Sequence, residues 1–288
     1  MAAHNEAAVL GRCLDSLLAD ARPGEFEVVV VANGCTDATA EVAAARPGVR
    51  VLDLPAPGKV AALNAGDQLA RGFPRIYLDA DIVLPTGGLR ALRDALAAGP
   101  PVLAAAPRRE VDVSRSPALV RSYYAISSRL PAFQGTLFGR GTVAISAAGR
   151  ARFDQFPEVV ADDLFLDSLF TTEQKVQVDA VSARVAAPRT TRDLLRRLVR
   201  VRRGNESLRA ATGHAEGNHS GVRRSSRTSW LRDVALAEPR LLPAAACYAA
   251  ITLTAALAAR LPDRSPGGWG RDESSRADDV PAEAGGSP

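Results

Sequence analysis

Apolar residues in the first 110 positions alternate between two spacings. Over 7–21 they recur three and four positions apart, the period of an amphipathic helix, whereas 26–32 is a valine-rich run typical of a buried strand. Further helices are predicted over 38–45, 60–71 and 89–98, and further strands over 49–54, 75–78 and 102–106. Strands that alternate with helices predict an α/β fold, with a mostly parallel sheet covered by helices on both faces.

The pattern is less regular beyond residue 110. It predicts helices over 116–129, 147–153, 163–171 and 190–211, a strand over 142–145, and a hairpin that pairs 176–178 with 183–186. The segment 212–240 begins with a polar, Gly- and Ser-containing stretch, which predicts a linker and then an amphipathic segment. We therefore predict one main domain over 1–211, with halves at 1–110 and 111–211.

The C-terminal region divides into an apolar part and a polar part. Residues 241–259 carry no charge, so 241–261 is predicted to be an apolar helix that spans or contacts a membrane. Because nine of these 19 residues are Ala, a helix packed on the domain is the alternative. In the last segment, 262–288, 13 of 27 residues are Pro, Gly or Ser, which predicts disorder.

Positive charge is concentrated in one block. The net charge is +4, yet between Arg184 and Arg232 there are 13 Arg against three acidic residues. An anionic membrane surface or a phosphorylated substrate would suit such a block. Nucleic acid is disfavoured because no aromatic residues are interleaved to stack on bases. Three widely spaced cysteines exclude a disulfide framework and favour a reducing compartment.

Two carboxylates follow the strand predicted over 75–78. Asp79 and Asp81 stand at alternate positions where a parallel sheet presents its ligands, at the carboxyl ends of its strands. Their negative charges repel unless a cation lies between them, and carboxylate oxygens suit Mg²⁺ or Mn²⁺. Asp-x-Asp alone is a common pattern, but its place after a buried strand predicts a divalent metal site.

Several ordered motifs resemble those of family 2 glycosyltransferases. They are Ala3-His-Asn-Glu6, Asn33-Gly-Cys-Thr-Asp37, Gly58-Lys-Val-Ala-Ala-Leu-Asn64, Asp79-Ala-Asp81, Phe138-Gly-Arg-Gly141, Ala161-Asp-Asp-Leu164 and Arg200-Val-Arg-Arg-Gly204. The resemblance covers about the first 205 residues and implies a Rossmann-like GT-A fold that transfers sugars with inversion of configuration. It also implies that 1–110 is the nucleotide-sugar half and 111–211 the acceptor half.

The resemblance implies roles for individual residues. Asp79 and Asp81 would hold Mg²⁺ or Mn²⁺, and Asp79 would also bind the donor. The other residues implied to bind the nucleotide-sugar donor are His4, Asn5, Glu6, Asn33, Lys59, Asn64, Arg200 and Arg203. Asn33 stands where the family has a carboxylate, Asn64 is as suited to bracing its loop, and Asp37 is suited to capping the following helix. Arg200 and Arg203 would clamp the diphosphate, with a solvated helix face as the alternative.

The pair Asp162 and Asp163 matches the catalytic pair of the family. Its second member, Asp163, is implied to be the base that removes a proton from the acceptor hydroxyl, and Asp162 would assist. The alternative is that either residue caps the helix that follows. Val201 stands where the family's polymer synthases have a Trp that stacks on the growing chain, so transfer of a single sugar is expected.

One departure concerns the first strand. In the GT-A fold a central strand leads into the segment that resembles Ala3–Glu6, and only two residues stand before that segment here. Without a central strand, the edges and apolar faces of its neighbours would be exposed. We therefore expect Met1 to be internal to the true reading frame.

The expected function is metal-dependent, inverting transfer of a sugar from a nucleotide-sugar to an acceptor hydroxyl. Because the basic block precedes 241–259, the domain is expected on the cytoplasmic face of the cell membrane, where a lipid-linked acceptor is available. Such an enzyme would act on a cell-envelope glycan, a glycolipid or a natural product. A nucleotidyltransferase and a non-catalytic nucleotide-sugar binder are the alternatives.

Overall fold

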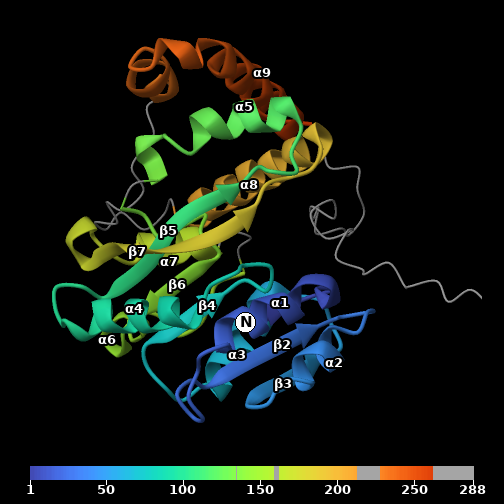
Figure 1. The fold of residues 1–288 in the computed structure, drawn as a ribbon, viewed down its shortest axis with the longest axis vertical. Coiled ribbons are helices and arrows are strands. Elements are labelled where there is room, and N and C mark those ends of the chain that lie inside the picture. Colours follow the sequence, from blue (N-terminus) through green and yellow to red (C-terminus); the bar gives the residue numbers. More distant parts are fainter. Residues whose placement is uncertain (134, 159–161, 213–227, 262–288) are drawn as a thin grey trace, which may run out of the picture.

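The computed structural model describes residues 1–133, 135–158, 162–212 and 228–261 (Figure 1). Most of the predicted linker, 213–227, and the predicted disordered tail, 262–288, lie outside the described residues. The core is a mixed α/β unit, and a layer of helices lies beyond one end of β5 and β7 (Figure 1). The predicted α/β class with an additional C-terminal helix is confirmed.

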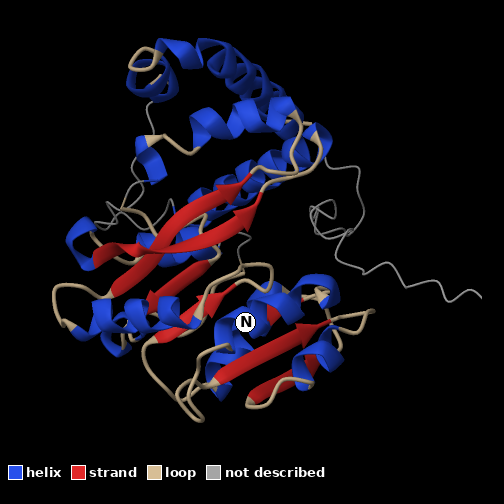
Figure 2. Cartoon of the chain, viewed as in Figure 1, coloured by secondary structure: helices blue, strands red, loops and turns tan. Residues whose placement is uncertain are grey.

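Short helices and strands alternate through most of the chain (Figure 2). The strands are β1 (Ala2–Ala3), β2 (Val28–Asn33), β3 (Val49–Leu54), β4 (Arg75–Leu78), β5 (Ala104–Asp112), β6 (Thr142–Ile145) and β7 (Lys175–Ala186). The α-helices are α1 (Ala7–Leu18), α2 (Thr39–Ala44), α3 (Lys59–Leu69), α4 (Thr86–Ala97), α5 (Ala118–Ser127), α6 (Ala147–Arg150), α7 (Asp162–Ser168), α8 (Thr191–Thr212) and α9 (Leu242–Ala259). Short helical turns are η1 (Pro131–Phe133), η2 (Thr172–Gln174), η3 (Trp230–Ala235) and η4 (Pro239–Leu241).

The predicted hairpin over 176–186 is wrong. These residues belong to the single strand β7, which pairs in parallel with β5, and a shift of register between Pro107 and Arg108 absorbs the extra residues. The physical reason lies in the middle of the segment. The predicted loop, 179–182, contains no Gly or Asn, and its Val181 is buried in the core, so the chain continues as one strand.

The strands form two hydrogen-bonded sheets, β1-β2-β3 and β4-β6-β5-β7. The first sheet is entirely parallel, as predicted. In the second, β5 and β7 are parallel, but β6 runs antiparallel to both β4 and β5. An apolar run such as 142–145 identifies a buried strand without fixing its direction, so this reversal was not predictable from periodicity.

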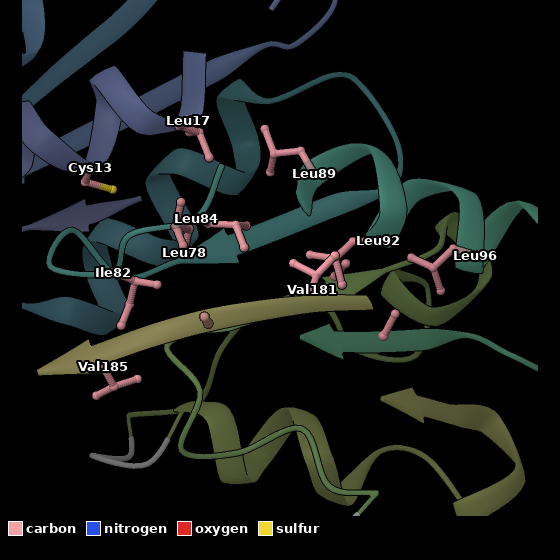
Figure 3. Close-up of a cluster of buried hydrophobic side chains, with 13 residues drawn as sticks. Cys13, Leu17, Leu78, Ile82, Leu84, Leu89, Leu92, Leu96, Val181 and Val185 are labelled. Atoms are coloured by element: carbon pink, nitrogen blue, oxygen red, sulfur yellow. The ribbon is translucent and has the colours of Figure 1, made fainter. Parts of the chain in front are cut away.

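Helices cover both faces of the second sheet. On one face, Leu17 of α1 and Leu92 of α4 cluster with Ala105 of β5 (Figure 3). On the other face, Leu63 of α3 and Leu166 of α7 cluster with the flanking strand residues Ala104 and Ala106. Successive side chains of a strand point to opposite faces, so β5 contributes to both cores. The predicted cover on both faces is confirmed.

A cavity of about 210 Å³ lies between β2 and β4. It is lined by Val28 and Val29 of β2, by residues of β4 and by Met1. The α-amino group of Met1 donates to the carbonyl of Val29 at 2.8 Å, and burial lowers its pKa to about 6. The two-residue strand β1 is an edge of the first sheet and pairs with β2 at Val31 and Ala32, beyond the part of β2 that lines the cavity. That the reading frame starts earlier stays a prediction.

A helical layer of α5, α8 and α9 covers the far end of β5 and β7 (Figure 1). Tyr248 of α9 stacks on Tyr123 of α5 with ring centroids 5.1 Å apart. Ile251 of α9 packs with Leu194 of α8 in the same buried cluster. The apolar C-terminal helix therefore lies against the domain along one of its faces.

Substitution of Leu92 tests how much the core between α4 and the sheet contributes to stability. Leu92→Ala is expected to lower the free energy of unfolding by about 2–5 kcal/mol, because the lost side chain leaves a cavity between α4 and the sheet. Leu119→Ala, at a leucine that is 49% exposed, is the matched control and should change stability by less than about 0.5 kcal/mol. Urea unfolding measures both values. Equal losses in the two variants would contradict the packing described here.

Candidate active site

The carboxylates after β4 are held in place by a close backbone contact. The Asp79 N–H donates to the carbonyl of Gly141 at 2.8 Å. Gly141 has a φ of 63°, and a Cβ atom there would clash with Ile82 and lie 3.2 Å from Asp79 Oδ2. Only glycine lets the two segments approach so closely. The Phe138–Gly141 motif and the Asp79–Asp81 motif are therefore one structural unit.

Lys59 joins carboxylates from the two halves of the chain. Its Nζ atom lies 2.9 Å from Asp79 Oδ1 and 2.9 Å from Asp162 Oδ1. Although burial disfavours its charge, the two carboxylates raise the pKa of Lys59 above its ordinary value. Burial raises the pKa of Asp162 to about 6, and the charge of Lys59 opposes this shift. Lys59, which the resemblance implies to bind the donor, thus lies between two acidic side chains.

Asp163 has different partners from its neighbour Asp162. Its Oδ2 atom accepts the N–H of Gly139 at 2.7 Å, and its Oδ1 atom accepts the N–H of Leu164 at 2.8 Å. The carboxylate thus links the start of α7 to the loop before β6. Asp162, by contrast, turns to Lys59.

Asn33 supports the loop that carries Lys59. It is 2% exposed, and its side-chain amide donates to the carbonyl of Ala3 at 2.7 Å. Its Oδ1 atom accepts the N–H of Gly58 at 2.9 Å, directly before α3. An amide can donate and accept at once, which a carboxylate cannot do. The replacement at this position therefore serves a bracing role in the described structure.

The segment that resembles Ala-His-Asn-Glu packs on the end of β2. His4 Nδ1 contacts the carbonyl of Asn33, and Asn5 Oδ1 accepts the N–H of Thr36 at 2.8 Å. Asn5 has a φ of 52°, in the left-handed region that Asn tolerates better than most residues. Glu6 is buried at the start of α1. The structure thus brings these predicted residues beside the Asn33 turn.

Asn64 and Asp37 brace neighbouring segments. Asn64 accepts the N–H of Phe156 at 2.8 Å and donates to its carbonyl at 3.3 Å. Asp37 accepts from the N–H groups of Ala7 and Thr39, which begin α1 and α2. Asn64 therefore holds the segment at Phe156 rather than its own loop, and Asp37 connects the starts of two helices.

The structure does not bring Arg203 to the carboxylates. Its Nη2 atom donates to the carbonyl of Leu261 at 2.8 Å, beyond the end of α9. Arg202, beside it, donates to the carbonyl of Thr252 in the same helix. The last carbonyls of a helix lack intrahelical partners and attract guanidinium groups, which accounts for the position of Arg203. Arg200 lies half-buried on α8.

Two arginines near the site carried no role in the sequence interpretation. Arg140 is 2% exposed and lies in the quoted Phe138–Gly141 motif. Arg109 of β5 lies with its guanidinium 5.0 Å from the ring centroid of Phe133. The glycine-flanked position of Arg140 was an available signal. The sequence contains no signal that marks Arg109, because it is one arginine among 34.

The donor set suits a metal that shares its ligands with a substrate. The described residues contain no cluster of three or more His, Cys, Asp or Glu side chains fit to hold an ion. Asp79 and Asp81 offer two carboxylates at one strand end. Mg²⁺ is typically bound by one or two carboxylates together with substrate phosphates, so the residues fit such an ion.

The fold is similar to solved glycosyltransferase structures. A mannosyltransferase from Pyrobaculum calidifontis, in complex with GDP-Man and Mn²⁺, is 22% identical with a TM-score of 0.57, and the match covers 90% of this chain and 76% of that chain. Glucosyl-3-phosphoglycerate synthase from Mycobacterium tuberculosis, in complex with UDP, is 22% identical with a TM-score of 0.54, over 74% and 78%. At such identity the likeness establishes the fold.

Sequence comparison gives the family. No curated protein matches the chain. The model of glycosyl transferase family 2 matches residues 1–153, which include the Asn33 turn, Lys59, Asp79 and Asp81. This match spans more than half of the chain, and the chain therefore belongs to glycosyl transferase family 2, a family of sugar-transferring enzymes.

Proposed function

We propose that the protein transfers one sugar from a nucleotide-sugar donor to an acceptor hydroxyl, with inversion and with Mg²⁺ or Mn²⁺. The observation that carries this proposal is the bridge of Lys59 between Asp79 and Asp162. It places the carboxylates of the donor half, 1–110, beside the carboxylate pair of the acceptor half, 111–211. A donor and an acceptor bound to the two halves would meet at this point.

Asp79 and Asp81 are the residues that would hold the metal. A divalent ion supplies a Lewis acid that stabilises the departing diphosphate. The likeness to a mannosyltransferase in complex with GDP-Man and Mn²⁺ supports this assignment. Lys59, 2.9 Å from Asp79, adds a positive charge on the same side, where it would also attract phosphate oxygens. The nucleotide site would be formed at the end of β2 by His4, Asn5, Glu6 and Asn33.

Asp163 is the proposed base. Its carboxylate is oriented by the N–H groups of Gly139 and Leu164, and each oxygen keeps a further lone pair to accept a proton from a hydroxyl. Asp162 would hold Lys59 in position instead. In an inverting transfer the hydroxyl attacks the anomeric carbon from the face opposite the nucleotide. The base must therefore lie on the acceptor side, which suits Asp163 at the start of α7.

Transfer of a single sugar is supported by the surface of α8. Val201, at the position of the stacking Trp of polymer synthases, is 46% exposed and offers no flat aromatic ring. A growing sugar chain would lack a platform there. We therefore propose a non-processive enzyme.

We also propose that α9 lies on a membrane surface rather than across it. The stretch Pro239–Ala259 is long and apolar enough to cross a membrane, with a mean hydropathy of 1.8. One face of α9 packs on α5 and α8, and the opposite face carries an exposed apolar stripe. The stripe comprises Leu242, Ala246, Ala250, Leu253, Leu257 and Leu261.

The packed face argues against spanning. A helix that crossed the bilayer would lose the contacts of Tyr248 and Ile251 with α5 and α8. A helix in the interface keeps them and buries only the stripe in lipid. This position would suit a lipid-linked acceptor, and so a role in glycolipid or cell-envelope glycan synthesis.

Thermal shift with UDP-, GDP- and dTDP-sugars, with and without Mn²⁺, tests donor binding. One donor at about 100 times its Kd should stabilise the protein by about 2.7 kcal/mol, and mainly when Mn²⁺ is present. Asp81→Asn should remove the Mn²⁺-dependent part, whereas Asp94→Asn, at an exposed carboxylate on α4, should keep it. Stabilisation without any need for Mn²⁺ would contradict the metal assignment.

Asp163→Asn tests the base. The rate of nucleoside diphosphate release from the donor should fall by about 10²- to 10⁴-fold while donor binding is kept, because an amide does not accept the proton. Asp154→Asn, at an exposed carboxylate of the same half, should release the nucleotide at the wild-type rate. Release of the nucleoside diphosphate at the wild-type rate by Asp163→Asn would contradict the assignment of Asp163 as the base.

The double variant Leu253→Ser and Leu257→Ser tests the membrane proposal. These leucines are 61% and 54% exposed, so the folded domain should tolerate the change. Partition onto anionic liposomes at low salt should fall at least about tenfold, since burying a leucine contributes about 1.5–3 kcal/mol. Phe73→Ser, at an exposed phenylalanine before β4, is the control and should bind as wild type. If the double variant bound liposomes as the wild type does, the proposal that the apolar stripe contacts lipid would be wrong.

A further inference from the structure

A second charged cluster is positive and consists of Arg109, Arg140 and Arg197. Arg140 lies at its base, with a guanidinium that donates to the carbonyls of Thr136, Pro107 and Phe133 and to Oε1 of Gln177. All of these acceptors are neutral. Burial lowers the pKa of Arg140 to about 10, which leaves the group protonated at neutral pH. Its hydrogen bonds are therefore made to neutral groups, while the charges of Asp167 and Asp179 favour its protonated form.

Arg109 lies close enough to Arg140 for the two positive charges to repel each other. It extends from β5 with its guanidinium 5.0 Å from the ring centroid of Phe133 and 5.9 Å from that of Tyr124. Its Nε atom is buried and has no hydrogen-bond acceptor among the described residues. Burial lowers the pKa of Arg109, and the positive charge of Arg197 on α8 lowers it further. The aromatic rings hold the guanidinium, but they offer its Nε–H group no acceptor.

The acids around the cluster do not balance it. Asp163 is close enough to favour the charged form of Arg109. The next acid, Asp167, already forms a buried ion pair with Lys175 at 3.1 Å. Asp167 and Asp179 favour the charged form of Arg140, so three carboxylates, one of them already paired with Lys175, lie near the three arginines. A buried donor without a partner costs about 1–3 kcal/mol, so an anion that accepted from Arg109 would stabilise this region.

We propose that the Arg109 cluster binds a phosphate group of the acceptor, next to the hydroxyl that Asp163 deprotonates. A planar guanidinium pairs with phosphate through two parallel hydrogen bonds. The donor diphosphate is the other source of phosphate. Arg140 and Arg197 belong to the acceptor half, however, and Arg109, at the boundary between the halves, lies close to both, whereas the proposed metal ligands and Lys59 all precede residue 82. The proposal rests on the proposed function and specifies its acceptor as a phosphorylated compound.

Calorimetric titration with glycerol 3-phosphate and with glycerol tests this site. The full chain is first saturated with Mn²⁺ and the nucleoside diphosphate that binds it best, so that the donor site is filled. Glycerol 3-phosphate should then bind and glycerol should not. Arg109→Gln should weaken this binding at least about tenfold, and Arg109→Lys, which keeps the charge but not the fork, should weaken it less. Arg108→Gln, at the exposed neighbour that bonds Ser182, should bind as wild type.

The outcomes distinguish a failure of the proposed phosphate site from a failure of the proposed function. A wild-type chain that binds the nucleotide but not glycerol 3-phosphate would overturn the phosphate site and leave the proposed function standing. If Arg109→Gln weakened nucleotide binding and spared glycerol 3-phosphate, the cluster would serve the donor and the proposal would be wrong. Binding of glycerol 3-phosphate without any nucleotide binding would support the anion site and contradict the proposed function. The Arg109→Lys result keeps the test valid if Arg109→Gln fails to fold.

Discussion

The site depends on one ammonium group between two carboxylates. Asp79 and Asp162 come from segments more than 80 residues apart, and both are at least partly removed from water. Like charges so placed repel, and the repulsion grows as water is excluded. Lys59 lies 2.9 Å from each and offsets that repulsion. The meeting of the two halves at the strand ends therefore depends on a residue at the first position of α3.

The surroundings of this bridge are built from backbone contacts. Asn33 fixes Gly58 ahead of Lys59, Gly141 receives the N–H of Asp79, and Asp163 holds Gly139. Each contact joins a side chain or strand end to a loop that lacks regular hydrogen bonds of its own. Asp79 and Asp162 thus flank Lys59, while Arg109, Arg140 and Arg197 form a separate positive group near Asp163. This division of charge suits a metal-bound diphosphate on one side and an anionic acceptor on the other.

The sequence predicted the donor half better than the acceptor half. Strands 49–54 and 75–78 were found with their predicted bounds, because apolar runs bounded by Pro or Gly mark buried strands locally. The carboxylates after β4 were predictable for the same reason. The continuity of β7 and the direction of β6 depend on partners distant in sequence. Arg109 and Arg140 were missed because their roles arise from tertiary burial, which an arginine-rich composition conceals.

The central claim is that the carboxylates joined by Lys59 and their neighbours Asp81 and Asp163 form one site for inverting sugar transfer. The most direct measurement is proton NMR of the slow, Mn²⁺-dependent hydrolysis of an α-linked nucleotide sugar, with water as the acceptor. The coupling constant of the anomeric proton identifies the first sugar released. The account predicts that the β-anomer appears first and that chelation of Mn²⁺ stops its release. Release of the α-anomer first, or hydrolysis indifferent to Mn²⁺, would contradict it.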